Sequence, residues 1–244
     1  MRILVTNDDG LDAEGLVVLS EVLSRKHDVC VFAPDRERSG VSQALTLGEA
    51  HKVRKIRDRT YTSSGTPTDC VLLAMLGAID FAPEAVVSGI NRGPNLGTDI
   101  VYSGTCGAAR EAVLGGIPGI AVSCASLAPR LRYGAAASFV LENLEALAAA
   151  CSAQAFINVN APSSDTASRG AEWSLPCARI YGNALKSFPG PDGFDYYFLS
   201  GGDSSARSDP ASDYAVVSSG KVSVTPILVQ PQVPAGFQSG REFL

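Results

Sequence analysis

The sequence predicts an α/β fold in which helices cover both faces of a mostly parallel sheet. Up to about residue 162, short apolar runs typical of buried strands alternate with segments of helical spacing. Beyond that point Ser, Gly, Pro and Tyr become frequent. We therefore expect one domain over residues 1–244, with a core over about 1–165 and a C-terminal extension over about 166–244.

The elements of the core follow from their apolar patterns, taken in chain order. Residues 3–33 contain a strand, a helix of spacing i, i+3, i+4 and a second strand, which is one parallel unit. The next helix has the clearest start, with Thr66 as cap, Pro67 at its first position and Asp69 as the capping-box acid, and it ends at Gly77. Further strands are predicted at 85–88, 117–123 and 156–159, and further helices at 107–114 and 135–150.

The C-terminal extension has a different pattern, because it contains apolar runs without helices between them. We expect strands at 196–200, 214–218 and 222–227. Exposed apolar strands of this kind pair readily with a copy of themselves. The extension is therefore predicted to be a β-hairpin that serves dimerisation.

Composition excludes several classes of protein. Apolar residues make up 45% of the 244 residues and charged residues 18%, which is too apolar for a disordered chain. The net charge is −5 and no long Lys/Arg run occurs, so binding of long nucleic acids is not expected. No apolar run approaches the length of a membrane span. Six cysteines without a CxxC pair indicate reduced thiols, and we expect a cytoplasmic protein.

Oxygen-bearing side chains gather where the predicted strands end. Asp8 and Asp9 follow the first strand, Ser39 the second, and Asn91 the strand at 85–88. Ligands bind at this edge of a parallel sheet, and a set of hard oxygen donors favours Mg²⁺ or Mn²⁺. The dipeptide alone is better explained by an ordinary turn with acidic residues at a helix start. A divalent-cation site is thus one of two interpretations.

A second group of residues suits an anion. Ser103, Gly104 and Thr105 precede the helix at 107–114, where free backbone N–H groups bind phosphate well. A plain Ser/Thr helix cap explains the same residues. Neither GxxxxGK[ST], GxGxxG nor GxSxG occurs, and His27 and His51 are not placed as a general base.

Taken together, five stretches resemble the SurE family of survival proteins: MRILVTNDDG, APDRERSG, GTPTDCV, VVSGINRGPNLGTD and YSGTCGAAREA, joined by the tail motif DYAVVSSGKVSVTP. The resemblance implies a Rossmann-like three-layer fold whose C-terminal hairpin is exchanged within a homodimer, sometimes a homotetramer. It implies a metal-dependent hydrolase of nucleoside 5′-monophosphates, acting also on 3′-monophosphates and short polyphosphate. The sequence departs from the family pattern at Gln43 and Cys106.

The resemblance also assigns roles to residues. One Mg²⁺ or Mn²⁺ per subunit would be held by Asp8, Asp9, Ser39 and Asn91, with Asp8 and Asp9 as catalytic residues. The phosphate of the substrate would contact Asn95, Ser103, Gly104 and Thr105. Either a water molecule or Asp8 itself would attack phosphorus. A module that senses nucleotide or phosphate without catalysis is the alternative function.

Overall fold

The computed structural model describes residues 1–126, 128–166, 168–201, 205–206 and 209–232, and its main feature is one nine-stranded sheet. The sheet has the order β3-β4-β2-β1-β5-β6-β7-β13-β8. Its strands are β1 (Arg2–Thr6), β2 (Asp28–Pro34), β3 (Val53–Arg57), β4 (Thr60–Ser63), β5 (Ala85–Arg92), β6 (Gly119–Cys124), β7 (Ala155–Ala161), β8 (Ala171–Trp173) and β13 (Val222–Leu228). The helices are α1 (Glu14–Leu23), α2 (Pro67–Met75), η1 (Gly97–Val101), α3 (Gly104–Leu114), α4 (Gly134–Ala150) and α5 (Asp213–Ser218).

The six central strands, from β4 to β7, are parallel. Chain order along the sheet reverses between β1 and β5, because β2 lies on one side of β1 and β5 on the other. Ligands of open α/β sheets bind at the carboxyl ends of the strands on either side of such a reversal. The fold therefore selects the ends of β1 and β5 as the expected site.

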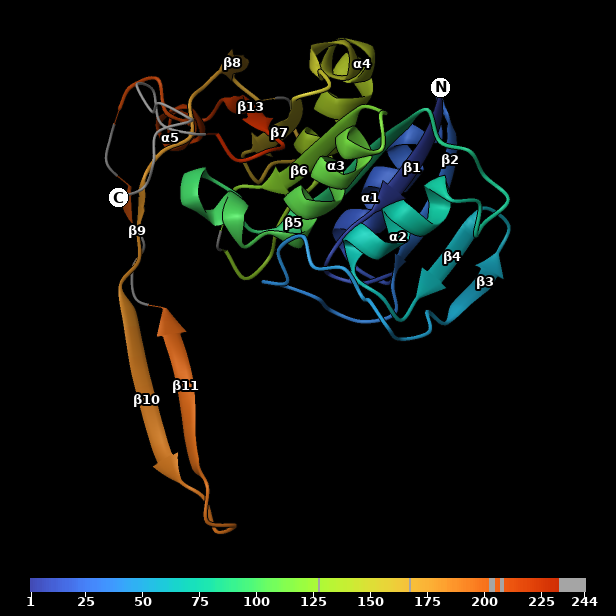
Figure 1. The fold of residues 1–244 in the computed structure, drawn as a ribbon. Helices are drawn as coiled ribbons and strands as arrows, with labels where there is room; N and C mark the ends of the chain where they lie inside the picture. The colour runs from blue at the N-terminus through green and yellow to red at the C-terminus, as the bar shows by residue number, and fades with distance from the viewer. Residues whose placement is uncertain (127, 167, 202–204, 207–208, 233–244) are drawn as a thin grey trace, which may run out of the picture.

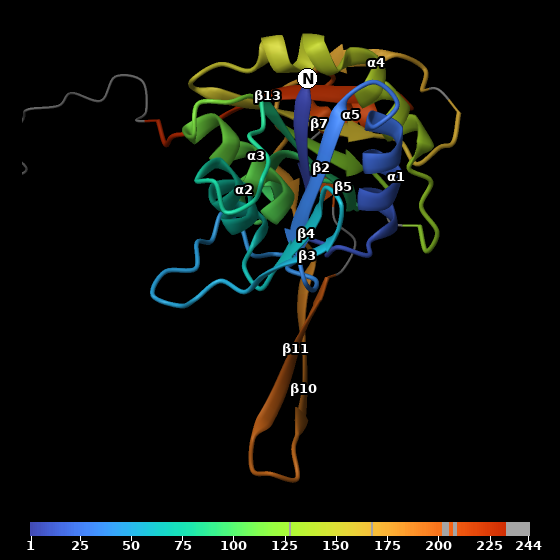
Figure 2. The same cartoon turned by 90° about the vertical axis from the view of Figure 1, so that its right-hand side faces the viewer.

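Helices cover both faces of the sheet, with α2 and α3 on one side and α1 on the other (Figure 2). Side chains of β1 alternate between the two layers: Ile3 and Val5 belong to the larger core with α1 and α4, and Leu4 to the core with α2 and α3. A strand buried on both faces needs apolar residues at every position, which explains the continuous run.

Most core predictions are confirmed. The α2 helix begins with the predicted capping box of Thr66 and Asp69 and has Pro67 at its start. Several elements are longer than predicted: β5 continues to Arg92, α3 begins at Gly104 and β7 covers Ala155–Ala161. Strands β3 and β4 were not predicted, and β3 is exposed along its whole length.

The C-terminal prediction is wrong for residues 214–218, which form the helix α5 instead of a strand. The Ser212 hydroxyl caps this helix by accepting from the Ala215 N–H at 3.3 Å, and Asp213 stands in its first turn. The predicted strand at 222–227 exists as β13, but it joins the main sheet antiparallel to β7.

The predicted hairpin is present and projects from the body of the molecule (Figure 1). It consists of β10 (Asn183–Pro189) and β11 (Asp195–Gly201), and its base lies near two short strands, β9 (Arg179–Ile180) and β12 (Ser205–Ala206). No helix among the described residues is both apolar and long enough to cross a membrane.

Candidate active site

Asp8 and Asp9 lie directly after β1, between the loop that follows β2 and the end of β5. The Arg38 N–H donates to the Asp8 carbonyl oxygen at 2.7 Å, and the Arg92 N–H donates to Asp9 Oδ2 at 3.1 Å. Two hydrogen bonds from main-chain N–H groups thus join three segments that are far apart in the sequence. The predicted meeting of strand-end loops is observed here.

A tight turn fixes the direction of the two carboxylates. The Asn7 side chain donates to the Gly10 carbonyl at 2.9 Å, and Gly10 has φ +99°, which favours glycine. A Cβ at Gly10 would also lie 3.2 Å from the Arg36 carbonyl carbon. The turn therefore needs Gly10 both for its conformation and for the approach of the neighbouring loop.

Asp8 is 3% exposed and lies under the N-terminus of α3. Its Oδ1 accepts a hydrogen bond from the Thr105 hydroxyl at 2.5 Å, and the main-chain N–H groups of Gly104 and Thr105 act to lower its pKa. A Cβ at Gly104 would lie 2.9 Å from the Asp8 Cβ, so only glycine permits this packing. Burial raises the pKa of Asp8 and the hydrogen bonds oppose the rise.

Asp9 has a different environment, because it is half-buried and faces a cavity. Burial is the first cause that raises its pKa to about 6, and repulsion from Asp8 is the second. The Arg92 N–H acts in the opposite direction. Two adjacent carboxylates, both destabilised as anions, form a place where a cation would be bound favourably.

The other two predicted ligands lie on the same edge of the sheet. Ser39 is exposed and its hydroxyl donates to Glu37 at 3.0 Å, which leaves the lone pairs of that oxygen available. Asn91 donates its side-chain N–H to the Gly93 carbonyl at 3.0 Å, so its amide oxygen is not used in that bond. The ligand set stays a prediction, although each member offers an oxygen.

The donor set is compatible with a hard cation. Among the residues that the structure describes, no three His, Cys, Asp or Glu side chains gather as a metal site. A cation at Asp8 and Asp9 would therefore take neutral oxygens as its remaining ligands, as Mg²⁺ and Mn²⁺ readily do. The buried Asn7 Oδ1, which has no hydrogen-bond partner among the described residues, is a further neutral oxygen beside the pair.

The start of α3 shows features of a helix cap and of an anion site, the two interpretations of residues 103–105. The Ser103 hydroxyl accepts from the Cys106 N–H at 3.1 Å and is a helix cap. The Thr105 hydroxyl, in contrast, donates to the Asp8 carboxylate, and the N–H groups of Gly104 and Thr105 act to lower the pKa of Asp8. The helix start thus binds an anionic side chain in this structure, and phosphate binding there stays a prediction.

Asn95 is 6% exposed and held by three side chains from β6 and β7. Asn160 binds the Asn95 main chain twice, accepting from its N–H at 2.9 Å and donating to its carbonyl at 3.0 Å. Asn158 donates to the same carbonyl at 2.8 Å, and the Asn95 side chain donates to the Ser123 hydroxyl at 2.8 Å.

Asn158 and Asn160 have roles that were not predicted from the sequence. The sequence does contain a signal that could have indicated them. Two asparagines stand at alternate positions of a buried strand, where side-chain amides need hydrogen-bond partners. The thiol of Cys106 also lies 3.6 Å from Asn158 Oδ1, so β7 contacts both the 93–97 loop and the first turn of α3. These asparagines position the loop that carries Asn95.

Comparison with known proteins agrees with this architecture. A family model described as survival protein SurE matches residues 3–183. The protein named 5′-nucleotidase SurE of Geobacter sulfurreducens is 43% identical over 229 residues, covering 93% of this chain and 87% of that protein. Its namesake in Thermosipho melanesiensis is 40% identical over 235 residues, covering 94% and 92%. The crystal structure of the SurE protein from Aquifex aeolicus has a TM-score of 0.82 at 33% identity and covers 95% of each chain.

Proposed function

The chain belongs to the SurE family, and we propose that it is a 5′-nucleotidase that hydrolyses nucleoside 5′-monophosphates to nucleoside and phosphate with the help of a divalent cation. Two relatives that carry the name 5′-nucleotidase match over 93% and 94% of this chain. The observation that supports the proposal within the fold is the buried Asp8 and its neighbour Asp9 at the start of α3, on the strand edge where α/β folds bind ligands.

We assign the cation to Asp8, Asp9, Ser39 and Asn91, with one Mg²⁺ or Mn²⁺ per subunit. When bound, such an ion offsets charge on a transferring phosphoryl group and makes a bound water more acidic. The chemistry of the donor set supports this choice, because the four side chains supply oxygen only. The paired carboxylates, whose pKa values are both raised, also support it.

The chain itself orients the reacting groups. Thr105 and the start of α3 fix Asp8 in one direction, and the Arg92 N–H holds one oxygen of Asp9. Asn95, on its clamped loop, would hold the phosphate from the side of β6 and β7. In hydrolysis an O–P bond forms from the nucleophile while the bond from phosphorus to the ester oxygen breaks, and positioning supplies most of the rate.

Water is the preferred nucleophile. Asp8 is 3% exposed and already binds Thr105, so its carboxylate is poorly accessible for in-line attack. A single turnover of nucleotide labelled in its phosphate, quenched rapidly in acid and followed by mass analysis of the protein, tests this choice. No phosphorylated protein is expected, whereas phosphate on Asp8 would establish an aspartyl-phosphate.

Phosphate release from nucleoside monophosphates is the decisive measurement. A chelator should abolish turnover, and Mg²⁺ or Mn²⁺ should restore it. Asp8→Asn and Asp9→Asn should each lower kcat by about a hundredfold or more, since each removes a charged ligand. The matched control is Asp12→Asn, an exposed carboxylate on the same loop, which should retain activity.

The sensing alternative predicts a different result from the same assay. A module without catalysis would bind nucleotide in the presence of the cation but release no phosphate. Full activity in Asp8→Asn would contradict the ligand assignment instead, and rescue by Zn²⁺ alone would contradict the oxygen-donor argument.

We further propose a homodimer or homotetramer assembled through the β10–β11 hairpin. This hairpin exposes a row of apolar and aromatic side chains that a second copy would cover: Leu185, Phe188, Phe194, Tyr196, Tyr197, Phe198 and Leu199. We also propose a cytoplasmic location, which the six unpaired cysteine thiols support.

A further inference from the structure

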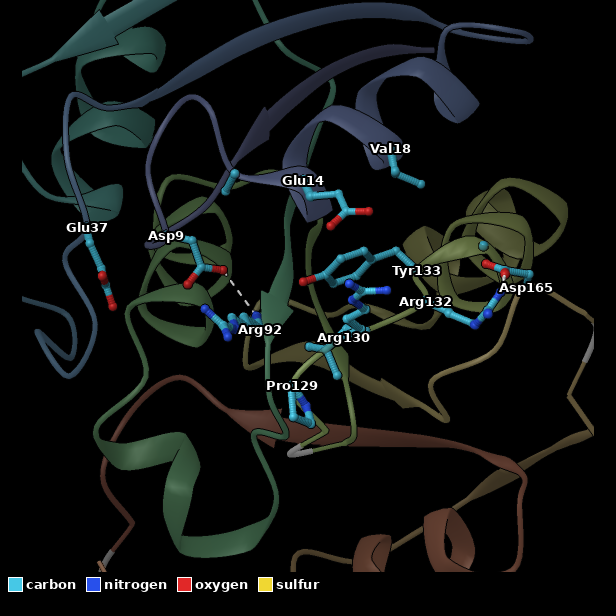
Figure 3. Close-up of a pocket in the computed structure, with 13 residues that line it drawn as sticks. Asp9, Glu14, Val18, Glu37, Arg92, Pro129, Arg130, Arg132, Tyr133 and Asp165 are labelled. Atoms are coloured by element: carbon cyan, nitrogen blue, oxygen red, sulfur yellow. Dashed lines mark hydrogen bonds and ion pairs between the residues drawn. The ribbon is translucent and has the colours of Figure 1, made fainter. Parts of the chain in front are cut away.

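A cavity of about 840 Å³ opens beside Asp9 (Figure 3). Its walls are the first turns of α1, the end of β5 at Arg92 and the segment 129–134 that leads into α4. Cavities of this size commonly bind small molecules. The cavity has space for a nucleoside. Binding of the phosphate at the carboxylate pair would not by itself require a cavity of this size.

The position of the cavity relates it to the carboxylate pair. Asp8 contacts α3, whereas its neighbour Asp9 lines the cavity. The cavity thus begins on the side of the pair opposite to the helix start where phosphate is predicted to bind. An ester with its phosphorus at the carboxylates would have its alcohol part within reach of this space.

Tyr133 supplies a rigid polar group to the cavity wall. The residue is 7% exposed, and its hydroxyl points into the cavity between Glu14 and Arg92 (Figure 3). Gly15 lets α1 approach both β5 and this ring, because a Cβ there would lie 2.1 Å from the Ile90 carbonyl oxygen and 3.2 Å from Tyr133 Cε1. Burial is the main cause that raises the pKa of Tyr133 to about 12, so the hydroxyl stays protonated and can donate.

The remaining lining combines charges of both signs with apolar surface. Glu14 offers an acceptor, and Arg130 offers a planar guanidinium, the group that stacks best on flat rings. Arg132 is paired with Asp165 at the far end. Donors and acceptors together suit sugar hydroxyls, which require both, and a guanidinium suits a heteroaromatic base.

We propose that this cavity is the subsite for the nucleoside, in which Tyr133 and Glu14 bind the sugar hydroxyls and Arg130 stacks on the base. The inference rests on the proposed nucleotidase function and deepens it. It predicts that selectivity for nucleotides over simple phosphate esters comes from the α1 and α4 side of the sheet, away from the groups that hold the phosphate.

Two substrates separate the subsite from the catalytic groups. Adenosine 5′-monophosphate fills the cavity, whereas p-nitrophenyl phosphate carries no sugar or purine base. Tyr133→Phe and Arg130→Ala should each raise KM for the nucleotide by about threefold to tenfold, the loss expected for one hydrogen bond or one stacking contact. The factor by which KM rises for p-nitrophenyl phosphate should be at least threefold smaller. Arg54→Ala, an exposed arginine on β3, is the matched control.

Inhibition by adenosine gives a second readout that does not depend on turnover of the nucleotide. Its inhibition constant against p-nitrophenyl phosphate should rise in Arg130→Ala by the same factor as KM. An equal increase in KM for both substrates, or no increase for either, would contradict the proposed subsite. Absence of phosphate release from both substrates in the wild-type protein would instead contradict the nucleotidase proposal.

Discussion

Asp8 and Asp9 are adjacent in sequence but differ in what they contact. Asp8 accepts a hydrogen bond from Thr105 at the start of α3, whereas Asp9 lines the cavity and accepts from the Arg92 N–H. These contacts affect the two pKa values differently. Hydrogen bonds oppose the rise in the pKa of Asp8, whereas burial and repulsion from Asp8 raise the pKa of Asp9 to about 6. A pair of this kind costs stability until a cation binds.

We therefore expect Asp9→Asn to stabilise the chelated protein above about pH 6. A raised carboxyl pKa means that the folded state binds the proton more tightly than the unfolded chain. The penalty for ionisation thus grows as pH rises from about 4 to about 6 and is complete above that range. Thermal unfolding with a chelator at about pH 7.5 should show a gain of roughly 2 °C or more, and at about pH 4 none. An unchanged melting temperature at the higher pH would contradict the repulsion argument.

Asn160 should contribute to both stability and turnover. Asn160→Ala leaves two buried main-chain groups of Asn95 with fewer partners, which costs about 1–3 kcal/mol. We expect a lower denaturant midpoint together with a lower kcat on nucleotide. Asn143→Ala is the control, because Asn143 is half-buried and bonds only within its own helix, to the Phe139 carbonyl at 2.8 Å. A loss of stability without any loss of kcat would show that the clamp is not needed for catalysis.

The sequence allowed a prediction of the site where each residue follows a strand. Asp8, Asp9 and Ser39 could be placed this way, because parallel strands end at one edge, and Asn91 is the next-to-last residue of β5. Asn158 and Asn160 could not, since their partners are main-chain groups of a loop more than sixty residues away. Side chains that bind another segment's backbone leave no local pattern.

At the scale of elements, the hairpin is separate from the sheet but tied to the site loop. Buried Asp213 of α5 accepts from the Gly97 N–H at 2.7 Å and from the Cys177 N–H at 3.0 Å. The Tyr181 hydroxyl donates to Asp99 of η1 at 2.6 Å. The base of the hairpin therefore contacts the helix that follows the Asn95 loop, so contacts made by a partner on β10 and β11 would act close to the site.

Replacing residues 184–200 by a short Gly/Ser linker should give monomers. Asn183 and Gly201 are paired across the base of the hairpin, so a short linker can join them. Removal of everything beyond residue 190 would be a poor test, because it also deletes β13 from the main sheet. Sedimentation velocity measures the number of subunits per particle. An unchanged number of subunits would contradict assembly through the hairpin.

A pair of point variants tests the same idea with less disturbance. Phe188→Ser combined with Leu199→Ser removes two exposed apolar side chains of the hairpin and should weaken the dimer. Leu76→Ser, at a residue that is 75% exposed but outside the hairpin, is the matched control and should leave assembly unchanged.

Elements with strong local signals were predictable, and those defined by distant contacts were not. The start of α2 follows from three residues within four positions, Thr66, Pro67 and Asp69. Helix α5 contains one Tyr and two Val, residue types favoured in strands, but Ser212 caps its start. The exposed, charged β3 forms only because β4 pairs with it.

For the molecule as a whole, binding of the cation should be visible in its stability. A ligand that binds only the folded state adds about 2.7 kcal/mol at a hundredfold excess over Kd. For a chain of this length that is roughly 5–10 °C in melting temperature. Mg²⁺ or Mn²⁺ should raise the melting temperature of the chelated wild type and not of Asp8→Asn, and an equal shift in both would place the ion elsewhere.

The main sheet is complete only when β13, which lies late in the chain, has been synthesised. This strand pairs antiparallel with β7, which is formed by residues 155–161. On the ribosome, β7 thus presents an open edge while the next sixty residues, including the apolar hairpin, are being made. The nascent chain passes through a stage with an unpaired strand and an uncovered hairpin together, and chaperone contact is most useful in that interval.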